Sequence, residues 1–167
     1  MKGHKFFLEA IASYLKYHKD ILILISGSGN KEYKVKLSVL VRELGITTQV
    51  LFTGMLRDMT LFYSACDLIV VPSIAEPFVR VIIEAFASRV PLIATRVGGI
   101  PKILEDGYNG KLISYGNTSQ LVEAVDEFIQ NAESAAGFAL VAYNDVLTKY
   151  TEELYQNRLA RIIEDQL

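Results

Sequence analysis

The sequence contains few residues that could form a cross-link or hold a metal ion. It has one cysteine, Cys66, and two histidines, His4 and His18. A single cysteine excludes a disulfide within the chain and fits a reducing compartment, so we interpret Cys66 as a small apolar side chain in a core. One cysteine and two histidines also fall short of a zinc cluster. We therefore expect no metal site.

The sequence also lacks a strong net charge and a long apolar segment. The formal net charge of the 167-residue chain is −2, which gives no electrostatic reason to expect nucleic acid or an anionic membrane as a partner. No apolar run approaches the roughly 20 residues of a membrane-spanning helix, and the start of the sequence has no signal-peptide pattern. We expect a cytoplasmic protein.

What the sequence does contain is a regular alternation of strand and helix patterns. Hydrophobic residues make up 51% of the chain, enough for one substantial core. The alternation predicts an α/β fold with a parallel sheet, flanked by helices and joined by right-handed crossovers. We expect buried strands at 21–25, 50–53, 68–71, 92–95 and 111–113, and helices at 5–17, 31–44, 60–66, 78–88, 118–129 and from about 134 onward.

The most informative stretch runs from Leu68 to Thr95. Two short apolar runs, 68–71 and 92–95, are typical of buried strands. Between them, 78–88 is apolar nearly all round, which predicts a helix buried on most faces. This helix contains Glu84, and a carboxylate there is costly unless a polar group meets it. We expect the Glu84 side chain to be largely buried and to point to the carboxyl edge of the sheet.

A second acid, Glu76, lies eight residues before Glu84, after a strand and before the helix. Acids at the carboxyl end of a parallel strand lie where open α/β sheets bind ligands. Both acids also have plainer interpretations. Glu76 could be an acid favoured by the helix dipole, and Glu84 could be a buried acid capped by a neighbouring backbone group or lysine.

The motif around these acids resembles a known family. Glu76-Pro77-Phe78, then Glu84-Ala85-Phe86-Ala87, then the run 90–95 are similar to the E-x7-E region of GT-B glycosyltransferases. Within these, the sequence most resembles the retaining family 4 enzymes (glycosyl transferases group 1). Further pieces follow in the family's order over almost the whole chain: Lys2-Gly3, Gly27-Ser28-Gly29, the strand ending at Gly54, Gly98-Gly99-Ile100-Pro101 and Asp106-Gly107-Tyr108-Asn109-Gly110.

The resemblance implies a Rossmann-like fold and a role in sugar transfer. Residues 1–167 would form a single nucleotide-sugar-binding domain, the C-terminal half of a GT-B enzyme, with the N-terminal acceptor domain absent. The reaction would move a sugar from a UDP-, GDP- or ADP-sugar to an acceptor hydroxyl, with retention and with no metal or cofactor. The other half would hold the acceptor, a glycan, lipid or small molecule, and the full enzyme could associate peripherally with a membrane.

The resemblance also assigns roles to the two acids and to Lys2. Glu76 would hold hydroxyls of the donor sugar near the anomeric carbon and is the catalytic candidate. Glu84 would accept hydrogen bonds from the ribose hydroxyls. Lys2 would meet the donor's diphosphate, although the plainer interpretation is a solvated terminal lysine.

Backbone groups would complete the donor site. The amides of Phe78, Val79 and Arg80 open the helix after Glu76 and would stabilise the leaving diphosphate. Gly27 and Gly29 would form a glycine-rich turn that faces the ligand. A lone G-x-G is weak evidence, and a tight strand-to-helix turn is the alternative.

Three positions depart from the family pattern: Val79 and Arg89 replace the usual glycines, and Lys102 replaces an acid. Val is stiff and bulky, and Arg adopts the left-handed conformation only at a cost. These changes favour a rival interpretation, a non-catalytic nucleotide-binding or pairing subunit. A nucleotide-sugar epimerase on the same architecture fits less well. His4 and His18 match no family motif.

The first strand of the family fold is apparently missing. Residues 1–4 cannot supply a strand of the usual ~5 residues before the first helix. The strands at 21–25 and 68–71 would then flank a gap. Either these two strands pair directly, or a partner supplies a strand, or the sequence is a fragment of a longer protein. We favour the fragment and expect the isolated chain to be marginally stable or self-associated.

Overall fold

The computed structural model describes residues 2–76, 80–156 and 164. Strands and helices alternate along the chain, as the sequence predicts. The elements are α1 (His4–Tyr17), β1 (Ile23–Ser26), α2 (Lys31–Glu43), η1 (Thr47–Gln49), β2 (Val50–Gly54), α3 (Met59–Ser64), β3 (Ile69–Val71), α4 (Arg80–Ala87), β4 (Leu92–Thr95), η2 (Ile100–Lys102), β5 (Lys111–Ile113), α5 (Thr118–Gln130) and α6 (Ala132–Lys149).

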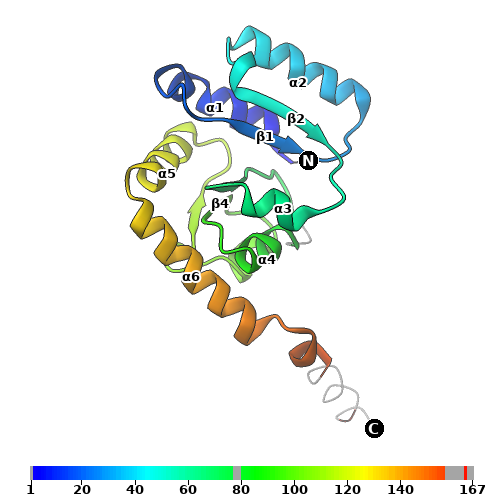
Figure 1. Cartoon of the computed structure of the whole chain (residues 1–167), viewed down its shortest axis with the longest axis vertical. Helices are drawn as coiled ribbons and strands as arrows, with labels where there is room; N and C mark the ends of the chain where they lie inside the picture. Colours follow the sequence, from blue (N-terminus) through cyan, green and yellow to red (C-terminus); the bar gives the residue numbers. More distant parts are fainter. Residues whose placement is uncertain (1, 77–79, 157–163, 165–167) are drawn as a thin grey trace.

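The strands form two separate parallel sheets instead of one. β1 pairs with β2 in the first half-sheet, and the second has the order β3-β4-β5. Ile23 lies opposite Val50 in one, and Val70 opposite Ile93 in the other. In the described part of the chain β1 and β3 do not pair, so the two strands do not close up on each other, and the predicted gap is present. Figure 1 shows the first half-sheet with α1 and α2, and the second with α3 to α6.

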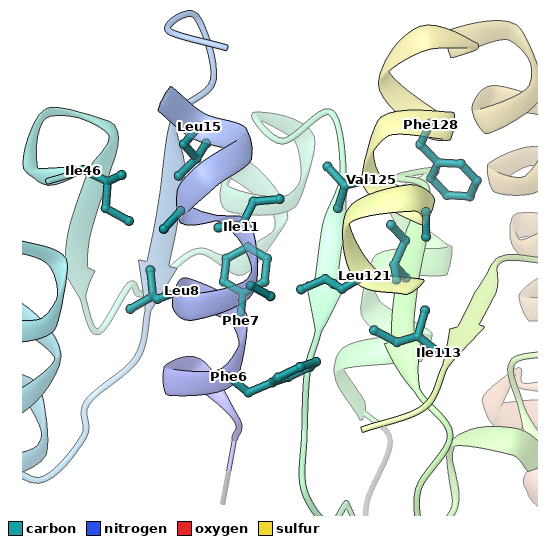
Figure 2. Packing of buried hydrophobic residues seen from close by; sticks show 14 of the residues in the cluster. Phe6, Phe7, Leu8, Ile11, Leu15, Ile46, Ile113, Leu121, Val125 and Phe128 are labelled. Atoms are coloured by element: carbon teal, nitrogen blue, oxygen red, sulfur yellow. The ribbon is translucent and has the colours of Figure 1, made fainter. Parts of the chain in front are cut away.

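Helices α1 and α5 join the two half-sheets through one apolar cluster. The α1 side chains Leu8, Ile11 and Leu15 are fully buried, and burying each contributes about 1.5–3 kcal/mol. They pack with side chains of α5, such as Leu121 and Phe128 (Figure 2). The same cluster takes in residues of both half-sheets, including Ile23, Phe52, Ile93 and Ile113. The two halves are therefore held by helices rather than by strand pairing.

The helix expected at 78–88 is less buried than its sequence suggests. Ile82, Ala85 and Phe86 of α4 are buried, but Arg80 and Ala87 are exposed. Val81, Ile83 and Glu84 are half-buried, and α4 contacts α3, α6, β3 and β4, so the helix is covered on most of its surface but not all round. None of the helices within 2–76 and 80–156 has the length and apolar character to cross a membrane.

Strand β1 also departs from its prediction. Its residues Ile23, Leu24 and Ile25 are apolar, yet all are only half-buried, and the preceding Leu22 is 56% exposed. We expected a fully buried strand here, because unbroken β-branched runs are typical of parallel strands covered on both faces. Within the described residues β1 is paired along one edge only, with β2, so its other edge is not covered by a strand.

Candidate functional site

The loops that follow β3 and β4 cross at the carboxyl edge of the second half-sheet. Thr95 Oγ1 donates a hydrogen bond to the Ser73 carbonyl at 2.6 Å, and the Gly99 N–H donates to the Glu76 carbonyl at 3.2 Å. Gly98 has a φ of +55°, and a Cβ there would lie 2.4 Å from the Glu76 carbonyl oxygen. Only glycine fits this close approach. The crossing holds Glu76 in a fixed place at the sheet edge.

The amino end of the chain lies on the same edge. Gly3 has a φ of +69°, and a Cβ there would lie 1.6 Å from the Pro72 carbonyl oxygen. This contact places Lys2 over Glu76, and Lys2 Nζ is 2.5 Å from Glu76 Oε2. Ser73 Oγ donates to the same carboxylate oxygen at 3.2 Å. The structure thus brings together two predicted site residues that are far apart in the sequence.

The Glu76 carboxylate is buried although it is charged. Its side chain is 8% exposed, whereas that of Lys2 is 57% exposed. Burying a carboxylate is tolerated when a cation and a hydrogen bond compensate it, which Lys2 and Ser73 do here. The ammonium of Lys2 therefore sits at the solvent side of an anchored acid, where an incoming anion could reach it.

Glu84 is placed differently from its prediction. Its side chain is 36% exposed, so the expectation of a largely buried carboxylate is wrong. It accepts a hydrogen bond from Tyr63 Oη at 2.9 Å and one from Arg80 Nη2 at 3.3 Å. Glu84 therefore faces α3, which packs against α4. Burial and the hydrogen bond to Glu84 raise the pKa of Tyr63 above its usual value, so the phenol stays a neutral donor.

The two acids share no hydrogen bond in the described structure, and their immediate partners differ. Glu76 contacts Lys2 and Ser73, whereas Glu84 contacts Tyr63 and Arg80. The sequence pattern did not point to Ser73 or Tyr63. Tyr63 could have been noticed as the one residue of α3 that combines a large apolar ring with a hydroxyl group, but Ser73 gives no sequence signal of its own.

The backbone groups proposed for the diphosphate are only partly described. Phe78 and Val79 lie outside the described residues. Arg80 is the first described residue of α4, and its exposed guanidinium pairs with the Glu84 carboxylate one helical turn further along the chain. The amide of Arg80 stays a prediction.

Gly27 and Gly29 lie in the exposed loop between β1 and α2. Gly27 has a φ of +131°, and its N–H donates to the Gly54 carbonyl at 2.8 Å, which is a tight turn. A cavity of about 1370 Å³ nevertheless connects this loop with Lys2 and Ser73. Both glycines therefore border the same opening as the site at β3.

Two of the three departures from the family pattern can be located. Arg89 ends α4 with a φ of 56°, the one positive φ outside glycine in the described residues. Its guanidinium carbon lies 4.0 Å from the ring centre of Tyr143. Lys102 is exposed at the end of η2. Val79 is outside the described residues.

The described residues hold no group of three or more His, Cys, Asp and Glu side chains arranged as a metal site would require. What they do hold is a set of parallel strands whose carboxyl ends carry a buried acid, a lysine and glycine-rich loops. This layout is that of a ligand-binding α/β domain.

Comparison with known proteins identifies which such domain this is. The family model described as "Glycosyl transferases group 1" matches residues 1–145. The chain belongs to this family, and its fold is that of the C-terminal domain of GT-B glycosyltransferases.

Individual relatives agree with this assignment. The chain is 31% identical over 173 residues to the D-inositol 3-phosphate glycosyltransferase of Corynebacterium jeikeium, covering 92% of this chain and 41% of that protein. The crystal structure of the C-terminal domain of a group 1 glycosyl transferase (LpcC) from Francisella tularensis matches with a TM-score of 0.82 at 30% identity, over 90% of this chain and 80% of that one.

A third structure shares the fold at lower identity. Anabaena HepE in complex with UDP matches with a TM-score of 0.89 at 24% identity, over 98% of this chain and 45% of that one. The chain spans less than half the length of the curated relatives that it matches.

Proposed function

We propose that this chain is the donor-binding half of a retaining glycosyltransferase that uses a nucleotide-diphosphate sugar. The observation that carries the proposal is the pairing of Lys2 with the buried Glu76 at the carboxyl edge of β3 and β4. A cation beside an anchored acid offers one group for a diphosphate and one for sugar hydroxyls. The family membership and the structure of HepE with UDP-glucose support it.

In the proposed reaction the bond between the anomeric carbon and the diphosphate oxygen breaks, and its electron pair goes to the diphosphate. An acceptor hydroxyl oxygen bonds to the same carbon on the same face, and its proton passes to the departing diphosphate oxygen. Lys2 and the backbone amides at the start of α4, up to Arg80, would stabilise the growing charge of the leaving group. Glu76 would accept hydrogen bonds from the sugar, and Glu84 from the ribose.

A second candidate function has one observation in its favour. Both oxygens of Glu84 already accept hydrogen bonds, from Tyr63 and Arg80. In a non-catalytic nucleotide-binding subunit Glu84 would have this structural role alone. In the enzyme, ribose hydroxyls would have to replace or share these two partners.

Calorimetric titration with UDP, GDP and ADP tests the diphosphate contact. We expect Lys2→Met to weaken binding of the preferred nucleotide about fivefold, which is roughly 1 kcal/mol for an exposed charge pair. Lys5→Met is the matched control, because Lys5 is also exposed at the start of α1 but pairs with Glu9. Equal effects of the two substitutions would contradict the role of Lys2.

The same titration separates the sugar contact from the diphosphate contact. We expect Glu76→Gln to leave the UDP affinity within about twofold, because Glu76 does not hold the diphosphate. The additional affinity of the matching UDP-sugar over UDP should disappear. If Glu76→Gln weakens the binding of UDP and of the UDP-sugar equally, Glu76 supports the fold and does not contact the sugar.

A further inference from the structure

Tyr63 holds a hydroxyl group against Glu84 from within an apolar core cluster. The Tyr63 side chain is 3% exposed and belongs to the same cluster as Phe86 of α4 and Leu92 of β4. Its Oη donates a hydrogen bond to Glu84 Oε2 at 2.9 Å. Figure 1 shows α3, which carries Tyr63, beside α4. Because the ring is closely packed, the hydroxyl keeps a fixed position relative to α4.

The second partner of Glu84 is held less firmly. Arg80 lies one turn before Glu84 on α4, its side chain is 83% exposed, and its Nη2 is 3.3 Å from Glu84 Oε1. Ion pairs between exposed side chains contribute little, because water screens them and both side chains lose conformational freedom. A ligand can therefore displace Arg80 from Oε1 more easily than it can displace Tyr63 from Oε2.

The Tyr63 hydroxyl stays protonated at neutral pH and can act only as a donor to Glu84. Burial, and then the hydrogen bond to Glu84, raise the pKa of Tyr63 above its ordinary value of 10. A hydroxyl that donates to a carboxylate makes a stronger hydrogen bond than one between two neutral groups. An ionised carboxylate has about four acceptor positions. The single bond from Tyr63 therefore leaves most of the Glu84 carboxylate available to other donors.

Tyr63 also borders the cavity that carries the candidate site. It lines the cavity of about 1370 Å³ together with Lys2, Ser73 and Gly27. Glu84, its hydrogen-bond partner, is 36% exposed. The contact between Tyr63 and Glu84 thus lies at the border between the core and the cavity, where the core fixes one partner and solvent reaches the other.

We propose that Tyr63 is a positioning residue for nucleoside diphosphates, which fixes Glu84 Oε2 so that the remaining acceptor positions of the carboxylate meet the ribose hydroxyls. The inference rests on the proposed donor-binding function and adds the residue that orients Glu84. Arg80 leaves Oε1 to a ribose hydroxyl, and Tyr63 keeps Oε2. A carboxylate that is already held by a buried donor loses little freedom on binding, which lowers the cost of association.

The test compares nucleotides with and without the ribose hydroxyls. UDP, GDP, ADP and their 2′,3′-dideoxy counterparts are titrated by calorimetry into the 167-residue chain and into Tyr63→Phe, which keeps the buried ring and removes only the hydroxyl. Tyr14→Phe is the matched control. Tyr14 Oη also donates to a carboxylate, Asp126 Oδ1 at 2.7 Å, but this contact joins α1 to α5, and Tyr14 is not among the described residues that line the cavity.

For the nucleotide that binds best, we expect the unsubstituted chain to prefer the ribose form over the dideoxy form about tenfold, the effect of a hydrogen bond to a charged group. Tyr63→Phe should reduce this preference to about twofold and leave the affinity for the dideoxy form within about twofold. Tyr14→Phe should keep the full preference. An unchanged preference in Tyr63→Phe, or an equal loss of affinity for both forms, would overturn the proposal.

A double substitution tests whether Tyr63 acts through Glu84. We expect Glu84→Ala to remove the preference for the ribose form. Adding Tyr63→Phe should then have no further effect on binding, because substitutions that act on one contact are not additive. A further loss of affinity for the ribose form would mean that Tyr63 contacts the nucleotide itself, which would overturn the positioning role.

The same titrations distinguish a failure of this inference from a failure of the proposed function. If the unsubstituted chain binds none of these nucleotides, the donor-binding function is wrong, and the role of Tyr63 is wrong with it. If it binds the ribose and dideoxy forms equally, the diphosphate contact is retained. Glu84 then does not receive the ribose, and Tyr63 does not position it.

Discussion

At the scale of single residues, Arg89 combines an unfavourable backbone conformation with a favourable side-chain contact. It ends α4 in the left-handed region, where the Val90 N–H donates to the Ala85 carbonyl at 3.2 Å and closes the helix. Glycine is the usual residue at such a helix end. Arg89 keeps its side chain over the ring of Tyr143, which offsets part of the strain.

Two substitutions of Arg89 separate these effects. Arg89→Ala keeps the strain and removes the contact with Tyr143, so we expect the free energy of unfolding to fall by about 0.5–1 kcal/mol. Arg89→Gly also relieves the strain and should be more stable than Arg89→Ala by about 1 kcal/mol. Urea denaturation measures both. If Gly is less stable than Ala at this position, Arg89 is not strained.

His4 makes the stability of the fold depend on pH. Its Nδ1 is buried and has no hydrogen-bond partner in the described structure. Burial, and then the nearby charge of Lys2, lower the pKa of His4 below its ordinary value of 6.5. His4 is therefore protonated more readily in the unfolded chain than in the folded chain. As the pH falls, this difference lowers the free energy of unfolding.

We expect the free energy of unfolding to decrease as the pH is lowered from 7 through the ordinary value of 6.5 toward the lower folded-state pKa. His4→Asn should flatten the pH dependence in this window, because the group that titrates is gone. Denaturation with urea at a series of pH values measures the slopes. If the free energy of unfolding depends on pH equally in both proteins, the protonation of His4 does not affect stability.

At the scale of elements, a buried polar contact joins the loop before β5 to α6. Asn109 Nδ2 donates to Asp145 Oδ2 at 2.8 Å, and Asn109 Oδ1 accepts from the Glu105 N–H at 2.8 Å. Asp145 is 6% exposed and also pairs with Lys149 at 2.5 Å. Asn109 therefore compensates a buried charge and anchors α6.

We expect Asn109→Ala to lower the free energy of unfolding by about 2–3 kcal/mol, because it leaves the Asp145 carboxylate short of a donor. Asn117→Ala is the control: this half-buried asparagine caps α5, and its loss should cost only about 1 kcal/mol. Chemical denaturation compares the two. A double substitution with Asp145→Ala should cost less than the sum of the single ones if Asn109 acts through Asp145.

The order and type of the elements could be predicted because they depend on local pattern. The strands β4 and β5 begin and end where the apolar runs predict, and α1 and α2 differ from prediction by one residue. The partial exposure of Glu84 could not be predicted, since a pattern of apolar residues does not show which face of α4 each neighbouring element covers. Tyr63, its partner, lies on a different helix.

The sequence predicted which residues form the candidate site, but it did not predict which contacts they make with one another. Lys2 and Glu76 were each identified from a motif, and their pairing depends on Gly3 fitting against the Pro72 carbonyl. Ser73 and Gly98 take part through backbone positions that only the folded loops define. Phe78 and Val79 lie outside the described residues, so their contacts with a diphosphate stay predictions.

At the scale of the whole molecule, the split sheet and the site are connected. The gap between β1 and β3 opens next to Lys2, because residues of both strands and Lys2 line the same cavity. We expect nucleotide binding by the 167-residue chain to be weak, because Lys2, the residue proposed to meet the diphosphate, is largely exposed and its side chain would have to be ordered on binding.

For the same molecule we expect no sugar transfer. The chain matches 41% of the length of the Corynebacterium relative, and we expect the acceptor to be held by the remainder of a full-length enzyme. Without that positioning the reaction loses the orientation of donor and acceptor, a contribution of about 7–11 kcal/mol to the barrier. A radiolabelled UDP-, GDP- or ADP-sugar, incubated with the purified chain and candidate acceptors, should give no product, and the Glu76→Gln protein serves as the control for contaminating enzymes. Transfer by the unmodified chain that disappears in Glu76→Gln would contradict the prediction and would show that this half holds both substrates.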